Sequence, residues 1–317
     1  MQDIASLFNF IRALTNSEEQ QITLLTSHFN LMAIRRLSNN AVYLTIFILI
    51  VIIAIILWYR ARRSSNKDEP TTTQHKNEMQ ATAKIDALEI PEPIEGNEVV
   101  QHKAYTLSFN PQYKIASWVA YLQTGKHSQN ATEVRTNNFT DDPLLHSSEA
   151  RDEDYNHSGY DRGHLAPAED MAWSKETMQE SFYYSNMVPQ DPKFNRGVWR
   201  RLEELVRYWS LAYDSIYIVT GPVFTQSMST IGSDKIAVPE KFYKVILEYN
   251  QKEARGIGFI LSNQPSAATL QSFAVSIDSV EHLTGINFFP RLDDTVEEKI
   301  ESNPRADEWL WKKRKNN

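Results

Sequence analysis

A short segment, Asp161 to Asp170, holds residue types that can do chemistry at a phosphate ester. It reads DRGHLAPAED and follows neither the period of a strand nor that of a helix, so we expect an exposed loop. Histidine has a reference pKa of about 6.5 and is largely neutral near pH 7. His164 is therefore a candidate general base for a water that attacks phosphorus. The alternative is a surface histidine beside Arg162.

A second segment, residues 186–207, supplies the other half of the arrangement. It reads NMVPQDPKFNRGVWRRLEELVR, with Asn195 at the start of a helix and Glu203 further along it. An asparagine carbonyl is a neutral, hard ligand that suits Mg²⁺ retaining most of its waters. The alternative for Asn195 is a helix cap, which this segment alone favours. Glu203 would orient metal-bound water by leaning back toward the helix start, and an ion pair with Arg207 is its alternative.

The composition requires local positive charge at such a site. The chain of 317 residues has a formal net charge of -7, from 33 Lys+Arg and 40 Asp+Glu, which argues against coating nucleic acid through bulk charge. Arginine holds phosphate oxygens in a bidentate manner. The arginines that could supply this field are Arg135, Arg162, Arg196, Arg200, Arg201 and Arg207, although a solvated helix face is favoured for Arg201. Because there are 0 Cys, any metal must be held by oxygen and imidazole ligands.

The elements that must position these residues indicate an α+β domain. Strand patterns occupy residues 105–110, 115–122, 215–221, 242–249, 256–262 and 273–277. Helix patterns occupy residues 174–185, 196–209 and 279–285. Short loops join the later strands, and strands and helices do not alternate regularly. We therefore predict a central, mainly antiparallel sheet flanked by helices.

The N-terminal part of the chain has a different character. The uncharged run AVYLTIFILIVIIAIILWY, residues 41–59, is long enough to cross a ~30 Å hydrocarbon core as a helix. Basic residues are more frequent after this run, which favours a cytoplasmic C-terminal side, whereas the basic segment from Met32 is typical of an uncleaved signal anchor with an exported C-terminal side. Met32 is also an alternative start to Met1. We predict an N-terminal segment at 1–40, a transmembrane helix at 41–59, a flexible linker at 60–103 and a folded domain at 104–312.

Several motifs, in this order, resemble those of one family: the DNA/RNA non-specific endonucleases, or endonuclease G-like ββα-metal nucleases. The resemblance spans roughly Tyr105 to Trp311 and rests mainly on DRGHLAPAED and SFYYSNMVPQDPKFNRGVWRRLE. YTLSFNP and WVAY precede these motifs, and VTGPVF, IAVPEKFYKVI and VEHLTGINFFP follow them. One motif would be weak evidence, but several in the same order are specific. The implied fold is a ββα-metal (His-Me finger) core beside a central antiparallel sheet, preceded here by one transmembrane helix.

The resemblance implies a role for each residue at the centre of the site. His164 would be the general base and Asn195 the direct ligand of Mg²⁺, with Mn²⁺ or another divalent cation as a substitute. Glu203 would belong to the water shell of the metal. These three residues together imply hydrolysis of phosphodiester bonds.

The resemblance also implies roles for the charged residues around this centre. Arg162 would support the phosphate, and Asp161 would position the DRGH segment. Arg135, in VRTNNFTDDP, matches an upstream arginine of the family that stabilises the transition state. Arg207 matches the family's helix arginine.

By this resemblance the chain is a membrane-anchored, Mg-dependent endonuclease that cuts DNA and RNA without regard to the sugar and leaves 5′-phosphate ends. One alternative is a membrane-anchored nucleic-acid-binding protein without turnover, but such a protein needs no general base. Another is a scaffold that recruits a protein partner. Beyond nucleic acid and the membrane, the partner hypotheses are a homodimer and a protein inhibitor.

The location of the domain is inferred from the damage that a misplaced nuclease would cause, rather than from particular residues. Secreted, periplasmic and mitochondrial members of the family exist. An unrestrained nuclease that faced the chromosome would be toxic. We therefore expect a periplasmic or extracellular domain, or one in the mitochondrial intermembrane space if the source is eukaryotic.

Overall fold

The computed structural model describes residues 87–250 and 254–311. The chain divides into a unit at 1–79 and a unit at 80–317, and the described residues all belong to the second. The predicted transmembrane run at 41–59 lies outside the described residues. Within the described ranges, no helix combines the length and apolar character that a membrane span requires.

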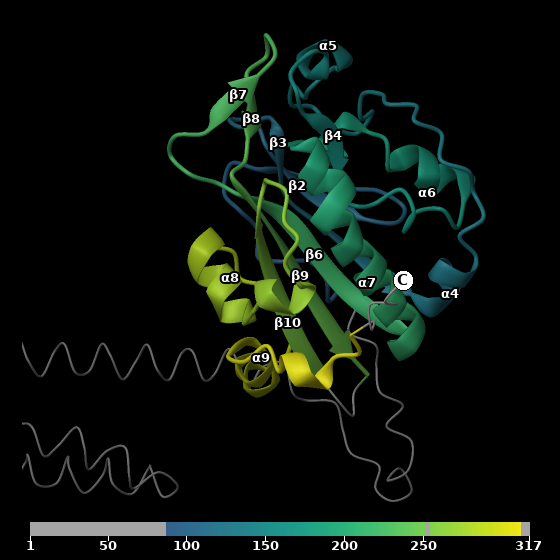
Figure 1. Cartoon of the computed structure of the whole chain (residues 1–317), viewed down its shortest axis with the longest axis vertical. Helices are drawn as coiled ribbons and strands as arrows, with labels where there is room; N and C mark the ends of the chain where they lie inside the picture. The colour runs from purple at the N-terminus through teal and green to yellow at the C-terminus, as the bar shows by residue number, and fades with distance from the viewer. Residues whose placement is uncertain (1–86, 251–253, 312–317) are drawn as a thin grey trace, which may run out of the picture. The chain divides into compact units, whose positions relative to one another are not determined.

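A seven-stranded sheet forms the centre of the second unit (Figure 1). The strand order is β1-β2-β3-β6-β9-β10-β11, and every neighbouring pair is antiparallel. The strands are β1 (Glu98–Gln101), β2 (Thr106–Asn110), β3 (Ile115–Thr124), β6 (Ser215–Val223), β9 (Lys241–Tyr249), β10 (Ala254–Ser262) and β11 (Ala274–Val275). The predicted α+β domain with a central antiparallel sheet is confirmed.

Helices and short ribbons surround this sheet. The helices are α4 (Gly125–Gln129), α5 (Asp152–Tyr155), α6 (Lys175–Glu180), α7 (Arg200–Tyr213), α8 (Ile277–Thr284) and α9 (Asp294–Glu301). Tighter or wider turns are the 3₁₀ segments η2 (Tyr184–Asn186), η4 (Leu270–Phe273) and η5 (Ala306–Glu308) and the π segment η3 (Phe194–Trp199). The two-stranded ribbons pair β4 (Asp161–His164) with β5 (Met187–Gln190), and β7 (Ser229–Ile231) with β8 (Ile236–Val238).

The sheet is buried on both faces. Alternate residues of β3 enter different cores: Val119 and Tyr121 belong to one, and Trp118 and Ala120 to the other. The first core also contains the buried side of α7 and the β4–β5 ribbon. The second contains residues of α8 and α9. Alternate side chains of a central strand therefore pack against α7 on one face of the sheet and against α8 and α9 on the other.

The sheet begins before Ala104. Strand β1 pairs with β2 from Glu98↔Phe109 to Gln101↔Thr106. Leu88, further upstream, is fully buried in the second core. The folded unit thus includes the end of the stretch that the sequence pattern assigned to a linker.

The DRGH segment is not the exposed loop that its pattern predicts. It forms strand β4, paired with β5 from Asp161↔Gln190 to His164↔Met187. Gly163 and His164 are buried, because this short ribbon packs into the first core. The partner strand MVPQ contains a proline and lies far along the chain, so no local pattern reveals the pairing.

Two predicted elements are shorter in the structure. The helical pattern at 174–185 gives α6, which ends at Glu180, followed by the turn η2. The strand pattern at 273–277 gives β11, which ends at Val275. Ser276 then caps α8 by accepting a hydrogen bond from the Ser279 amide at 3.1 Å.

Candidate active site

A pocket of about 440 Å³ opens beside β4 and the start of α7. It is lined by all the sequence-predicted site residues except Arg207, namely Arg135, Asp161, Arg162, His164, Asn195 and Glu203. The other lining residues are Phe139, Pro167, Ala168, Glu169, Arg196 and Arg200. Residues distant in the sequence therefore meet at one polar concave site, as catalysis requires.

His164, the last residue of β4, is only 7% exposed. Its ring meets Phe182 edge-on, with centroids 4.9 Å apart, and its Nε2 has no hydrogen-bond partner among the described residues. Burial, assisted by the positive charge of Arg135, lowers the pKa of His164 to about 3, and a hydrogen bond with the Arg162 backbone opposes this shift. The imidazole is therefore neutral at physiological pH, with a nitrogen available to accept a proton.

Asp161 fixes the side chain of Asn195. The Asn195 Nδ2 donates to Asp161 Oδ2 at 2.9 Å, and the Arg196 Nε donates to the same oxygen at 2.8 Å. Asp191 accepts hydrogen bonds from the backbone amides of Lys193 and Phe194 at 2.8 and 3.0 Å. Asp191 therefore caps the start of the helical segment that contains Asn195. The structure thus does not use the Asn195 side chain as the helix cap. Its carbonyl oxygen is the atom left for a ligand in the pocket.

The donor set of the pocket fits a hard divalent cation. Asn195 offers a carbonyl oxygen, and Glu203 offers a half-buried carboxylate on the same lining. Magnesium prefers oxygen ligands, binds to one or two protein groups and keeps several waters. Burial raises the pKa of Glu203 to about 8, although the nearby Lys244 ammonium lowers it. A cation in the pocket would favour the ionised carboxylate.

Two arginines pack on the aromatic rings that surround His164. The Arg162 guanidinium lies 4.5 Å from the Phe139 ring centroid and pairs with Asp152. The Arg135 guanidinium lies 5.1 Å from the Phe182 ring centroid. Stacking on a ring orients a guanidinium and leaves its edge able to pair with an anion, as Arg162 does with Asp152.

The remaining arginines differ in their surroundings. Arg196 and Arg200 line the pocket and are exposed. Arg201 instead donates to the carbonyls of Ser266 and Ala268 at 3.2 and 3.1 Å. It therefore serves a surface loop rather than the pocket.

Arg207 lies outside the pocket lining. Its Nε donates to Asp170 Oδ1 at 2.7 Å, and Asp170 also accepts a hydrogen bond from the Tyr121 hydroxyl at 2.9 Å. The ion pair formed by Arg207 is thus with Asp170 rather than with Glu203. The structure places Arg207 as a support for the buried charges behind the pocket.

A comparison of the sequence with known protein families agrees with this assignment of the site. The family of DNA/RNA non-specific endonucleases matches residues 86–295. The chain belongs to this family. The resemblance carried by the DRGH segment and the segment at 186–207 is confirmed, and the similar proteins bear the names of nucleases.

Three similar proteins illustrate the membership. Human mitochondrial endonuclease G is 32% identical over 209 residues, which are 62% of this chain and 70% of that protein. Mitochondrial nuclease EXOG of Xenopus laevis is 32% identical over 217 residues, 63% of this chain, and the chain spans only 61% of its length. A crystal structure of the EndoG/EndoGI complex, which concerns the mechanism of EndoG inhibition, matches with a TM-score of 0.59 and 31% identity over 62% of this chain and 87% of that one.

Lys244 is a residue of the nuclease site region that the sequence analysis missed. It lies on β9, is fully buried, and its Nζ has no hydrogen-bond partner within the described part of the chain. The Nζ lies 5.0 Å from the Trp199 ring centroid. Burial lowers the pKa of Lys244 to about 8, and the carboxylate of Glu203 opposes the shift. A lysine within the mainly apolar strand pattern FYKVILEY was the available signal.

Asn186 is a second missed residue, and its role is to position the DRGH segment. Its side-chain oxygen accepts from the Ala166 amide at 2.9 Å. Its Nδ2 donates to the carbonyls of Ala166 and Ser181 at 3.0 and 2.8 Å. The fully buried amide thereby joins the residues after β4 to those after α6. No pattern in the sequence distinguishes it from a surface asparagine.

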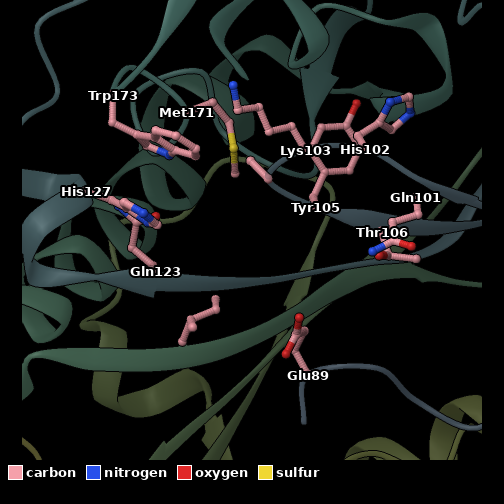
Figure 2. A pocket seen from close by; sticks show the side chains of 12 residues that line it. Glu89, Gln101, His102, Lys103, Tyr105, Thr106, Gln123, His127, Met171 and Trp173 are labelled. Carbon is pink, nitrogen blue, oxygen red and sulfur yellow. The ribbon is translucent and has the colours of Figure 1, made fainter. Parts of the chain in front are cut away.

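A second cavity, of about 320 Å³, contains none of the predicted site residues (Figure 2). His127 and Trp173 stack on one side of it, with ring centroids 4.4 Å apart, and Glu89 and Gln101 lie on another. It lacks the base and the metal-ligand set of the first pocket. We therefore assign the nuclease chemistry to the first pocket.

The electrostatics of His164 can be tested without an activity assay. Because burial and Arg135 disfavour the imidazolium, the His164 ring should remain neutral from pH 8 to pH 5, and Arg135→Gln should raise its pKa. Histidine-selective NMR of the full chain during a pH titration measures both. Arg201→Gln, whose guanidinium faces a surface loop, should leave the pKa unchanged. Titration of His164 near its ordinary value would contradict this account.

Proposed function

We propose that the chain is a divalent-metal-dependent endonuclease that hydrolyses phosphodiester bonds of both DNA and RNA. The observation that carries the proposal is the neutral, buried His164 with an unpartnered Nε2 in the same pocket as Asn195. The family description and the names of the relatives agree with it. Mg²⁺ is the proposed cation, held directly by Asn195.

In this proposal His164 removes the proton from the attacking water. Nε2 accepts that proton while the hydrogen bond to the Arg162 backbone holds the ring in place. A low pKa would make the free imidazole a weak base. The phosphate of a bound substrate is an anion, so it favours the imidazolium and raises the pKa toward the range in which proton transfer is efficient.

The arginines of the pocket hold the phosphate and the charge that develops on it. Arg162 and Arg135 are anchored by stacking on Phe139 and Phe182. A phosphate would compete for the guanidinium edges with Asp152, which pairs with Arg162, and with Glu169, whose Oε1 lies 3.9 Å from Arg135 Nη1. A bound cation would supply further stabilisation of negative charge at the phosphoryl group. Glu203 would accept hydrogen bonds from water beside Asn195. The bond between phosphorus and the 3′-oxygen breaks, which gives the 5′-phosphate ends that the family resemblance implies, and water bound to the cation would supply the proton for the leaving 3′-oxygen.

The partners and location form a separate part of the proposal. The apolar run at 41–59 would anchor the chain, with the nuclease domain in a compartment apart from the chromosome, and the mitochondrial names of two relatives support a mitochondrial site in a eukaryote. The EndoG/EndoGI complex supports a protein inhibitor as a partner. A homodimer remains a hypothesis.

The anchor is tested by extraction. A single apolar helix is not removed by alkaline carbonate, so the full chain should remain in the membrane pellet, whereas a chain lacking residues 41–59 should appear in the supernatant. Immunoblotting of the two fractions measures the distribution. Release of the full chain into the supernatant would remove the anchor from the proposal.

The activity is tested by cleavage of supercoiled plasmid and of RNA by the full chain, with Mg²⁺ or with EDTA. Both substrates should be cut only with the metal. His164→Ala should lower the rate by about 10²–10⁴-fold, the usual contribution of a general base. His282→Ala replaces an exposed histidine of α8 and should have no effect. A folded wild-type chain that cuts neither substrate with any divalent cation would favour binding without turnover.

The positioning of Asn195 is tested by Asp161→Asn. An amide in place of the carboxylate weakens the hold on the Asn195 and Arg196 side chains, so the Mg²⁺ concentration for half-maximal cleavage should rise by roughly 10–100-fold. Asp152→Asn is the matched control, because Asp152 pairs with Arg162 and makes no bond to Asn195. An unchanged Mg²⁺ requirement in Asp161→Asn would mean that Asn195 is not held through this carboxylate.

A further inference from the structure

A cluster of carboxylates lies on the sheet face opposite α7, where α8 and α9 pack on β10. Two glycines of β10 permit this close packing. A Cβ at Gly256 would lie 2.5 Å from Ile277 Cδ1 and 3.1 Å from the Ile300 carbonyl oxygen, and one at Gly258 would lie 2.7 Å from Val280 Cγ2. The start of α8 and the end of α9 therefore converge on the same strand.

The convergence brings three acidic side chains together. Asp278 and Glu281 are one turn apart on α8, and Glu301 is the last residue of α9. One carboxylate oxygen from each lies within 4.8 Å of the others. Two oxygens bound to one calcium ion at about 2.4 Å are at most about 4.8 Å apart, so the spacing suits a shared cation.

Glu301 is the observation that distinguishes this cluster from an ordinary acidic surface. The residue is only 7% exposed, and its Oε1 is buried without a hydrogen-bond partner among the described residues. A buried carboxylate without a partner is strongly unfavourable unless a proton or a cation neutralises it. Burial, and then the negative charges of Glu281, Glu297 and Asp278, raise the pKa of Glu301 to about 8.

No basic side chain of the described ranges neutralises the cluster. Asp278, Glu281 and Glu301 take part in none of the ion pairs there. The carboxylate of Glu281 accepts one hydrogen bond, through Oε1 from the Phe288 amide at 2.7 Å, which orients it. Glu301 also lies at the C-terminal end of α9, where the helix dipole favours a cation.

We propose that Asp278, Glu281 and Glu301 form a binding site for a divalent cation of the calcium class, separate from the catalytic pocket. The donors are all carboxylate oxygens, which suit a hard cation. They do not suit a metal that prefers thiolate or imidazole ligands. Asp278 is exposed, so waters can complete a coordination shell on its side. The bound cation joins α8 to α9 and stabilises their packing on β10.

The test is thermal unfolding of the full chain at pH 8 with and without ~10 mM CaCl₂, a concentration above the Kd of roughly 10⁻⁴–10⁻³ M of weak calcium sites. The wild-type Tm should rise by about 3 °C or more. Glu301→Gln removes the unpaired negative charge, so without calcium it should unfold at a higher temperature than the wild type. With calcium, its Tm should not rise.

Two controls separate this site from other calcium effects. Glu298→Gln makes the same charge change at an exposed position of α9 and should retain the rise. Asn195→Ala alters the catalytic pocket and should also retain it. An absent rise in the wild type, an equal rise in Glu301→Gln, or a rise lost in Asn195→Ala would each overturn the proposal.

Discussion

The carboxylate of Asp161 is the interaction on which the catalytic arrangement depends. It accepts hydrogen bonds from Asn195 and Arg196, while its own backbone pairs with Gln190 in the short ribbon. His164 lies at the other end of the same strand, so one side chain sets the position of Asn195 relative to the base. Asn195 lies two residues before a kink at Gly197, where the backbone leaves helical geometry ahead of α7. Among residues 87–250 and 254–311, the Asp161 carboxylate supplies the only side-chain hydrogen bond to the Asn195 amide.

A second layer of charge lies behind the pocket, and its members are interdependent. Burial drives the pKa of Glu203 up and that of Lys244 down, and each charge partly offsets the shift of the other. Asp170 carries the ion pair with Arg207 and accepts a hydrogen bond from Tyr121. A buried ammonium without a hydrogen-bond partner is unfavourable by itself. The nearby carboxylates offset this cost, and the ammonium in turn favours the ionised form of Glu203, which would be needed beside a cation.

The sheet could be predicted from the sequence because alternation is a local property. FYKVILEY is a strand by its pattern, and the same alternation places Lys244 on the face that meets Trp199. The types of the site residues could also be predicted, since His164 and Asn195 lie in recognisable segments. The β4–β5 pairing could not, because it joins two four-residue strands distant in the chain and because burial overrides the polar composition of DRGH. The role of Asn186 could not be predicted for the same reason, because its three side-chain hydrogen bonds form only after folding.

The two faces of the sheet are mechanically linked through strands that serve both. On β9, Lys244 faces the catalytic layer, whereas its neighbours Tyr243 and Val245 belong to the core under α8 and α9. Displacement of those helices would therefore disturb the strand that carries Lys244, even though no residue of the carboxylate cluster lines the catalytic pocket. Packed cores transmit strain because they contain few voids. The position of Lys244 relative to Glu203 therefore depends on stable packing of α8 and α9 against the sheet.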